Sequence, residues 1–249
     1  MVDISKRVAL SQAGMGVDAR LDVGLRRYML RIYNYMASGL LLSGLVAMAV
    51  VYTPLKAVFY AFDPATGAFA GLSILGMIAV FAPLVLLFGA MFAAQRMSAA
   101  ATQAFYWAFV TLQGISLSTL LVVYTGESVV RVFFITAAAF AALSLYGYTT
   151  RRDLSALGKF LFMGVVGILI AGLVNMFVES SMLQFVMSAV GVLVFSGLIA
   201  YDTQAIKERY VATMGTDEET KVAVFSALAL YLNFINLLQF LLMFLGNRE

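Results

Sequence analysis

The chain has 249 residues, of which 63% are hydrophobic and only 12% are charged, with a formal net charge of +3. Ordinary soluble domains carry about 25% charged residues, so this composition excludes a water-soluble globular protein and favours one that crosses a membrane several times. Cysteine and histidine are both absent, which excludes disulfides, thiolate chemistry, imidazole metal ligands and a histidine general base. The few, scattered basic residues give no indication of nucleic-acid binding.

Residues 1–30 are mixed and polar, and they include Lys6, Arg7, Arg20, Arg26 and Arg27. They lack the short apolar core and the small-residue cleavage site of a signal peptide. We therefore expect a cytoplasmic N-terminal arm, partly disordered, with Arg26, Arg27 and Arg31 touching lipid headgroups. Residues 31–249 are expected to form one transmembrane domain.

Seven apolar stretches follow, each close to the roughly 20 residues that a helix needs to cross the hydrocarbon. They are Ile32–Thr53, Gly71–Ala94, Thr102–Tyr124, Val130–Tyr148, Gly158–Val178, Met182–Gln204 and Val222–Leu245. Backbone polar groups have no water partner in lipid, so each stretch is predicted to be a helix. Small residues in the sixth stretch, including Gly191, Gly197 and Ala200, predict close helix packing.

Lysine and arginine predict the orientation, because they are enriched on the cytoplasmic side of membrane proteins. With the N-terminus inside, thirteen of the 16 basic residues fall on the cytoplasmic side, and only Lys56, Arg131 and Arg248 fall outside. We therefore expect the N-terminus in the cytoplasm and the C-terminus on the other side.

The segment LVFSGLIAYDTQAIKERY, from Leu193 to Tyr210, carries the carboxylate of Asp202 at the end of a long apolar run. An ionisable group there is costly and indicates a function. Arg96 ends the second stretch at the same face, so the two opposite charges are predicted to pair across a helix interface. The alternative is a carboxylate that reaches cytoplasmic water near Lys207 and Arg209.

The last stretch contains Asn233, Asn236 and Gln239 at successive spacings of three, which places them near one helical face. Such a polar row is costly against lipid, so the last helix is expected to lie inside the bundle, with its amides meeting polar groups of neighbouring helices. Hydrogen bonds that only fix packing and contacts with a passing ion remain alternative roles for this secondary polar seam.

A catalytic constellation is missing from the sequence. The serines lack a histidine, only one carboxylate is predicted to be buried, and no glycine-rich phosphate loop is present. Asp217, Glu218 and Glu219 are predicted to form a solvated turn and a helix start, where carboxylates favour the helix dipole. We therefore expect a protein that is not an enzyme and has no cofactor.

Three segments resemble the Bax inhibitor-1 family, also called the transmembrane Bax inhibitor motif family. They are GLIAYDTQAIK in the sixth stretch, ALALYLNFINLLQFLLMFLGNRE in the last, and Arg96, Met97 and Ser98 before the third. The resemblance implies an all-α membrane protein of seven transmembrane helices, with the last helix central and surrounded by the other six. It also implies a pH-modulated calcium leak and, in eukaryotic members, suppression of cell death.

The family's proposed sensor is a pair of aspartates that share a proton and are latched by an arginine. Asp202 matches the first aspartate and Arg96 matches the arginine, whereas Asn233 stands at the position of the second aspartate. Two neighbouring carboxylates resist joint ionisation, and this produces titration near neutral pH. An asparagine removes that repulsion, so we expect weaker or acid-shifted pH gating and less attraction for calcium in this chain.

Two functions follow as hypotheses. The first is a passive calcium or other cation leak through a bacterial inner membrane, with Asp202 as the proton-sensitive group and candidate calcium contact, Arg96 as its latch and Asn233 in the same seam. The second is a non-conducting protein that binds and modulates another membrane protein, such as a quality-control protease. Deleting the residues before Leu21 separates them, because a leak should persist and a partner contact should fail. A transporter is disfavoured by the absence of repeats and paired broken helices.

Overall fold

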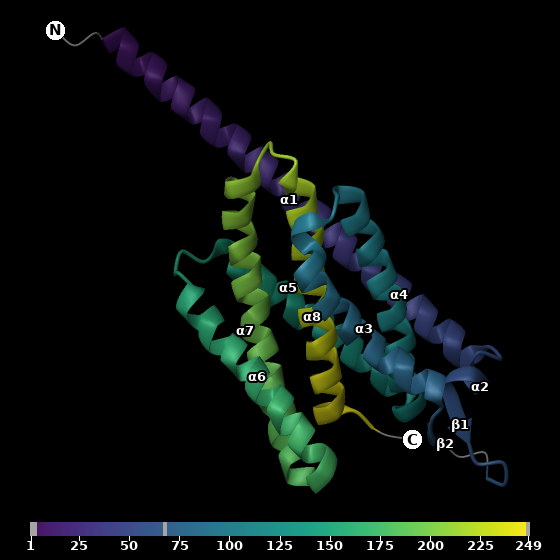
Figure 1. The fold of residues 1–249 in the computed structure, drawn as a ribbon. Helices are drawn as coiled ribbons and strands as arrows, with labels where there is room; N and C mark the ends of the chain where they lie inside the picture. Colours follow the sequence, from purple (N-terminus) through teal and green to yellow (C-terminus); the bar gives the residue numbers. More distant parts are fainter. Residues whose placement is uncertain (1–3, 67–68, 248–249) are drawn as a thin grey trace.

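A computed structural model describes residues 4–66 and 69–247, with side chains from Val23 onward except that of Met91. Figure 1 shows an almost entirely helical chain with one small hairpin. The elements are α1 (Ile4–Tyr52), α2 (Lys56–Phe59), β1 (Tyr60–Phe62), β2 (Phe69–Leu72), α3 (Ile74–Ala93), the 3-10 turn η1 (Ala94–Arg96), α4 (Ala99–Val123), α5 (Gly126–Thr149), α6 (Ser155–Val178), α7 (Ser181–Thr213) and α8 (Glu218–Leu245).

The helices confirm an all-α membrane protein. Within the described residues, six helices are long and apolar enough to cross a membrane, and α3 contains a shorter apolar segment, Ile74–Ala90. The first of the six covers Val23–Tyr52 of α1, and α1 continues without a break through residue 30, where the sequence had placed the end of the arm. Each of the six spans overlaps one of the seven predicted stretches, although the first begins earlier and that of α7 ends later.

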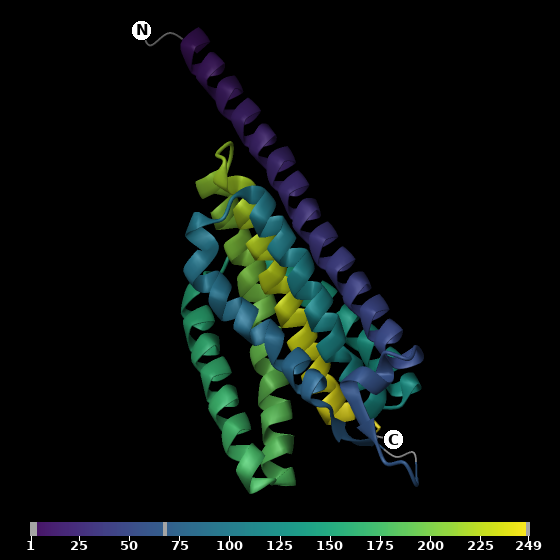
Figure 2. The same cartoon turned by 45° about the vertical axis from the view of Figure 1, so that its right-hand side comes forward.

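Helix α8 forms the centre of the bundle. In its apolar window 56% of the residues are buried, against 6% in the window of α6. Helices α1, α4, α5 and α7 pack directly against α8, whereas α3 packs mainly on α4 and α6 mainly on α7 (Figures 1 and 2). The last helix is therefore the most buried of the six spans, but four helices pack around it and two lie further out, so it is not surrounded by the other six as expected.

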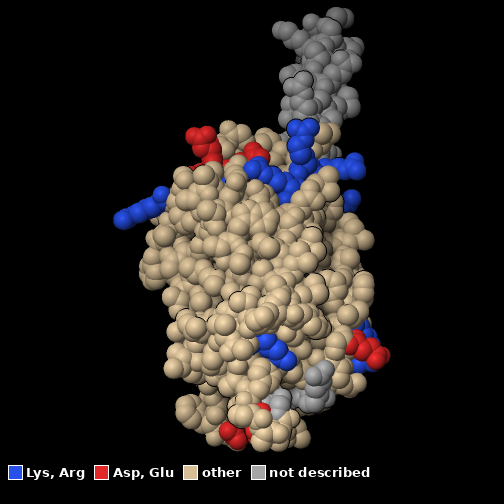
Figure 3. All heavy atoms as spheres, turned by 90° about the vertical axis from the view of Figure 1, so that its right-hand side faces the viewer, with Lys and Arg blue, Asp and Glu red and all other residues tan. Residues whose placement is uncertain are grey.

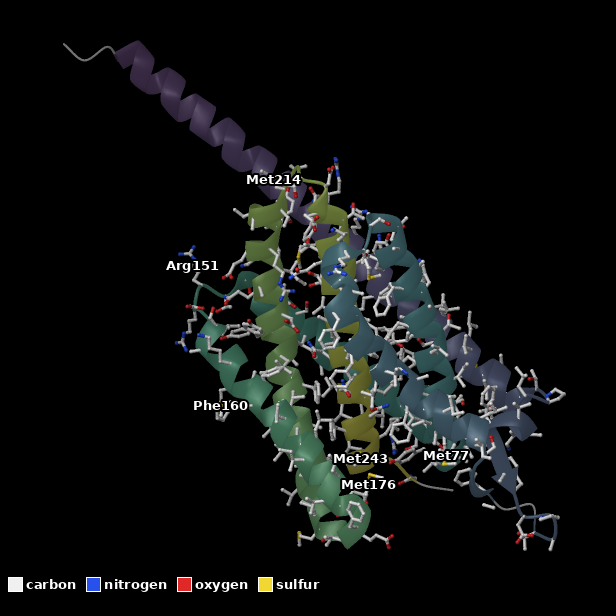
Figure 4. All side chains as sticks on the ribbon, in the orientation of Figure 1. Met77, Arg151, Phe160, Met176, Met214 and Met243 are labelled. Atoms are coloured by element: carbon white, nitrogen blue, oxygen red, sulfur yellow. The ribbon has the colours of Figure 1, made fainter. Side chains whose placement is uncertain are left out.

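The outer surface of the bundle is apolar. On α6, Phe160 is 69% exposed and Phe177 is 89% exposed. In Figure 4, Phe160 points away from the other helices, and so does Arg151 in the connection before α6. Monomeric soluble proteins rarely expose contiguous apolar surface on this scale, whereas acyl chains cover it without cost.

Four helices begin at a serine or threonine whose hydroxyl accepts a backbone N–H of the first turn, which satisfies one of the donors that a helix leaves free. These residues are Ser73 before α3, Ser98 before α4, Thr125 before α5 and Ser180 before α7. Pro83 lies within α3 and does not end that helix. The caps mark where these four helices begin.

The β1–β2 hairpin was not predicted. Its strands pair antiparallel, with Tyr60 opposite Leu72. The Tyr60 side chain is buried, and its hydroxyl lies 2.6 Å from the Ser118 hydroxyl of α4. This contact fixes the connection between α1 and α3 against the end of the bundle.

The connection between the sixth and last predicted stretches, Met182–Gln204 and Val222–Leu245, is shorter than the sequence indicated. Helix α7 continues to Thr213, and α8 begins at Glu218, so only a short turn separates them. The backbone hydrogen bonds of α7 extend beyond its apolar part, which is why hydropathy placed the end too early. Glu218 and Glu219 do lie in the first turn of α8, as expected.

Candidate functional site

An acid–amide pair joins α7 to α8. The Nδ2 atom of Asn233 donates a hydrogen bond to Oδ2 of Asp202 at 2.7 Å. Asn233 is only 6% exposed, and the Asp202 side chain is 15% exposed. Hydrogen bonds to ionised groups are about twice as strong as neutral ones, so this amide stabilises a carboxylate within the bundle. The expected contact between Asp202 and the amides of the last helix is present for Asn233.

The basic neighbour of this carboxylate is Arg209. It follows Asp202 by seven residues, about two turns, and so lies on the same face of α7. Its Nη2 atom is 3.9 Å from Oδ1 of Asp202, and its Nη1 atom donates to the Ser226 hydroxyl of α8 at 3.4 Å. The Arg209 side chain is 40% exposed, so the ion pair contributes little stability. Its positive charge nevertheless offsets a negative charge on Asp202.

Arg96 is not paired with Asp202 in this structure. It ends η1, its side chain is exposed, and no hydrogen bond or ion pair joins it to any part of the chain that the structure describes. Helix α3 packs mainly on α4 rather than α7, so nothing holds η1 against the carboxylate. The predicted pair of Arg96 with Asp202 is therefore not found, and Arg209, which the sequence placed only beside a water-exposed carboxylate, is the basic partner.

Thr203, the next residue after Asp202, begins a chain of hydroxyl groups. Its Oγ1 lies 3.0 Å from the Ser144 hydroxyl of α5, which in turn contacts the Tyr33 hydroxyl of α1. Thr203 and Ser144 are both buried. Three helices are thereby linked beside the acid, and the sequence did not predict this link.

Gln204 and Lys207 hold the end of α5 and its connection to α6. The Gln204 amide accepts from the Leu154 N–H and donates to the Arg152 carbonyl, both at 2.8 Å. The Lys207 ammonium donates to the Tyr148 carbonyl at 2.6 Å. The QAIK portion of the sixth stretch could have indicated these contacts, because two long polar side chains three residues apart lie on one helical face.

The amide row of α8 does not act as one group. Asn236 donates to the Leu232 carbonyl of its own helix at 2.8 Å. Gln239 is half-buried, and within the described residues no hydrogen bond involves its side chain. Asn233 is therefore the member of the row that reaches another helix.

The structure thus defines a multi-pass all-α membrane protein whose central helix shares a partly buried hydrogen bond with the Asp202 carboxyl group. The family profile described as "Inhibitor of apoptosis-promoting Bax1" matches residues 25–249. The chain belongs to the Bax inhibitor-1 family.

Full-length bacterial relatives agree with this membership. The chain is 46% identical over 251 residues to a protein of Caulobacter vibrioides and 41% identical over 250 residues to protein RP147 of Rickettsia prowazekii, with all of each chain covered. It is 40% identical over 228 residues to the inner membrane protein YbhL of Escherichia coli K12, covering 91% of this chain and 94% of that one.

Proposed function

We propose that this protein is a passive cation leak in which the Asp202 carboxylate attracts the ion and responds to protons. The observation that carries the proposal is a carboxylate inside a membrane span, bonded to the Asn233 amide and paired with Arg209. Ionisable groups at such positions mark ion and proton pathways. Calcium is the cation that the family resemblance favours.

We also propose that the chain crosses the membrane seven times and that its N-terminus lies in the cytoplasm. Helix α3 is the seventh crossing, because its 20 residues suffice for the hydrocarbon and its outer face is apolar. Figure 3 supports the orientation, since most of the visible basic side chains gather at the end where α1 enters the bundle. The Escherichia coli relative is named an inner membrane protein, and we extend that location to this chain.

Calcium is a passing ion in this account rather than a resident metal. A bound calcium takes six to eight oxygen ligands, whereas the described residues include no group of three acidic side chains able to hold a metal. Asp202 with its amide neighbour supplies too few oxygens for tight binding, and weak binding is what conduction needs. We propose a conducting role that needs neither covalent chemistry nor a cofactor.

The two arginines have different proposed roles. Arg209 neutralises Asp202 in the arrangement seen here and so opposes entry of a cation. Arg96 takes the latch role that the resemblance assigns only where η1 moves toward α7, since it is unpaired in the described structure.

Calcium flux into dye-loaded proteoliposomes tests the proposal. Asp202→Ala should reduce the flux at neutral pH at least about ten-fold toward that of protein-free vesicles, because it removes the charge that attracts the ion. Glu208→Ala is the matched control, since Glu208 is an exposed carboxylate on the same helix and its loss should leave the flux unchanged. Equal flux from the parent and Asp202→Ala would remove Asp202 from the mechanism.

A second candidate is a non-conducting protein that modulates another membrane protein. One feature favours it, because α1 rises well beyond the end of the bundle and offers a helix that a partner could contact (Figures 1 and 2). A chain that lacks residues 1–20 and still leaks calcium would support conduction, whereas loss of partner capture alone would support the contact role.

A further inference from the structure

Neighbouring arginines on α1 line two different grooves. Arg26 borders the groove between α1 and α5, whereas Arg27 and Arg31 border a groove of about 460 Å³ between α1 and α4. Asn34, Ser38 and Trp107 line the α1–α4 groove as well. Figure 3 faces the side of the molecule where α1 and α4 lie.

The α1 wall of this groove is a continuous polar stripe. Arg27, Arg31, Asn34 and Ser38 follow one another at spacings of four, three and four, so they share one helical face. Asn34 and Ser38 are exposed, and no side-chain hydrogen bond involves either of them in the described part of the chain. Both lie within the candidate span Val23–Tyr52, where a polar side chain facing lipid without a partner is unfavourable.

The groove carries positive charge and an interfacial aromatic residue. Arg27 is exposed, and no carboxylate pairs with it among the described residues. Arg31 donates from Nη2 to the Thr220 hydroxyl at 3.2 Å, which leaves its other donors for a ligand. Trp107 is 36% exposed and is of the residue type that concentrates at the level of lipid headgroups. None of the residues lining the groove is acidic.

We propose that the α1–α4 groove binds the headgroup of an anionic phospholipid. The phosphodiester contacts Arg27 and Arg31, the Asn34 amide and Ser38 hydroxyl bond the oxygens of the glycerol and ester groups, and the acyl chains start beside Trp107. The stripe descends about 16 Å from Arg27 to Ser38 at 1.5 Å per residue. That depth suits a molecule with a charged head and an apolar tail, which is why a lipid fits better than free phosphate.

The single tryptophan of the chain reports directly on this groove. The full-length protein is reconstituted in phosphatidylcholine vesicles that contain increasing fractions of brominated phosphatidylglycerol or brominated phosphatidylcholine, and quenching of Trp107 fluorescence is measured. A polybasic site gains about five-fold in affinity for anionic lipid per basic residue. We expect phosphatidylglycerol to compete at least about five-fold better than phosphatidylcholine for the groove.

Two single substitutions identify the groove. Arg27→Gln should lower the preference for phosphatidylglycerol about five-fold, whereas Arg26→Gln removes the same charge from the adjacent residue, which borders the other groove, and should lower the preference much less. Unchanged quenching by brominated phosphatidylcholine shows that both variants keep the fold. These results would support the site.

Four outcomes would overturn the proposal. The first is equal quenching of the parent by the two lipids, and the second is an equal loss of preference in Arg26→Gln. The third is abolition of the preference by inorganic phosphate in the buffer. The fourth is quenching by both lipids that rises as the protein is diluted in the membrane. The third outcome would assign the groove to free phosphate, and the fourth to a second copy of the chain.

Discussion

Replacing Asn233 with aspartate should make the leak depend strongly on pH across the neutral range. The Asn233 amide lies 2.7 Å from the Asp202 carboxylate, so the variant would place two carboxylates in direct contact, and they could not readily ionise together. The second negative charge would appear only as the pH rises, and we expect calcium flux to increase at least about five-fold between about pH 6 and about pH 8. The parent should show a weaker or more acidic response.

Calcium flux into proteoliposomes, measured at each pH for the parent and Asn233→Asp, checks this expectation. Asn236→Asp is the matched control, because Asn236 bonds the backbone of its own helix rather than Asp202. Coincident pH profiles for the parent and Asn233→Asp would show that the residue facing Asp202 does not set the proton response.

Gly147→Ala should destabilise the bundle where α5 crosses α7. A methyl group at Gly147 would lie 2.2 Å from the Ala200 carbonyl oxygen and 2.9 Å from the Ala200 Cα and carbonyl carbon. Those atoms belong to the backbone of a buried helix and cannot move aside cheaply. Overpacking typically costs about 1–3 kcal/mol, and we expect at least the upper part of that range because the two helices must separate.

Reversible unfolding in mixed detergent micelles measures this loss. Gly167→Ala serves as the control, since outside the neighbouring backbone of α6 no described atom lies within 4 Å of the added methyl group and alanine is the better helix former by about 1 kcal/mol. If Gly147→Ala unfolds at the same denaturant fraction as the parent, the backbones of α5 and α7 do not approach each other as closely as the structure shows.

The apolar stretches predicted the main helices because a membrane span must satisfy its own backbone hydrogen bonds. They missed the continuation of α7 to Thr213, since hydropathy detects the hydrocarbon and not the end of a hydrogen-bond ladder. The β1–β2 hairpin was not predicted for another reason. Its strands are three and four residues long, too short for a periodic pattern, and Tyr60 is held by a distant helix.

The candidate site was predictable in part. Asp202 stood out because charges in spans are rare, and the amide of Asn233 was expected nearby. The choice of its basic partner depends on how α3 packs, which no local pattern encodes. Thr203 and Gln204 were missed because uncharged polar residues are common in membrane helices, where they bond across interfaces, and only the structure shows which of them meet.

A double-mutant cycle in the calcium flux assay tests most directly whether Arg209 acts through Asp202. Arg209→Gln should raise the flux several-fold in the parent, because it leaves the carboxylate without the cation that lies 3.9 Å away. The same substitution in the Asp202→Ala background should have no effect. An equal change in both backgrounds, or no flux from any of the four proteins, would contradict the proposed role of this carboxylate.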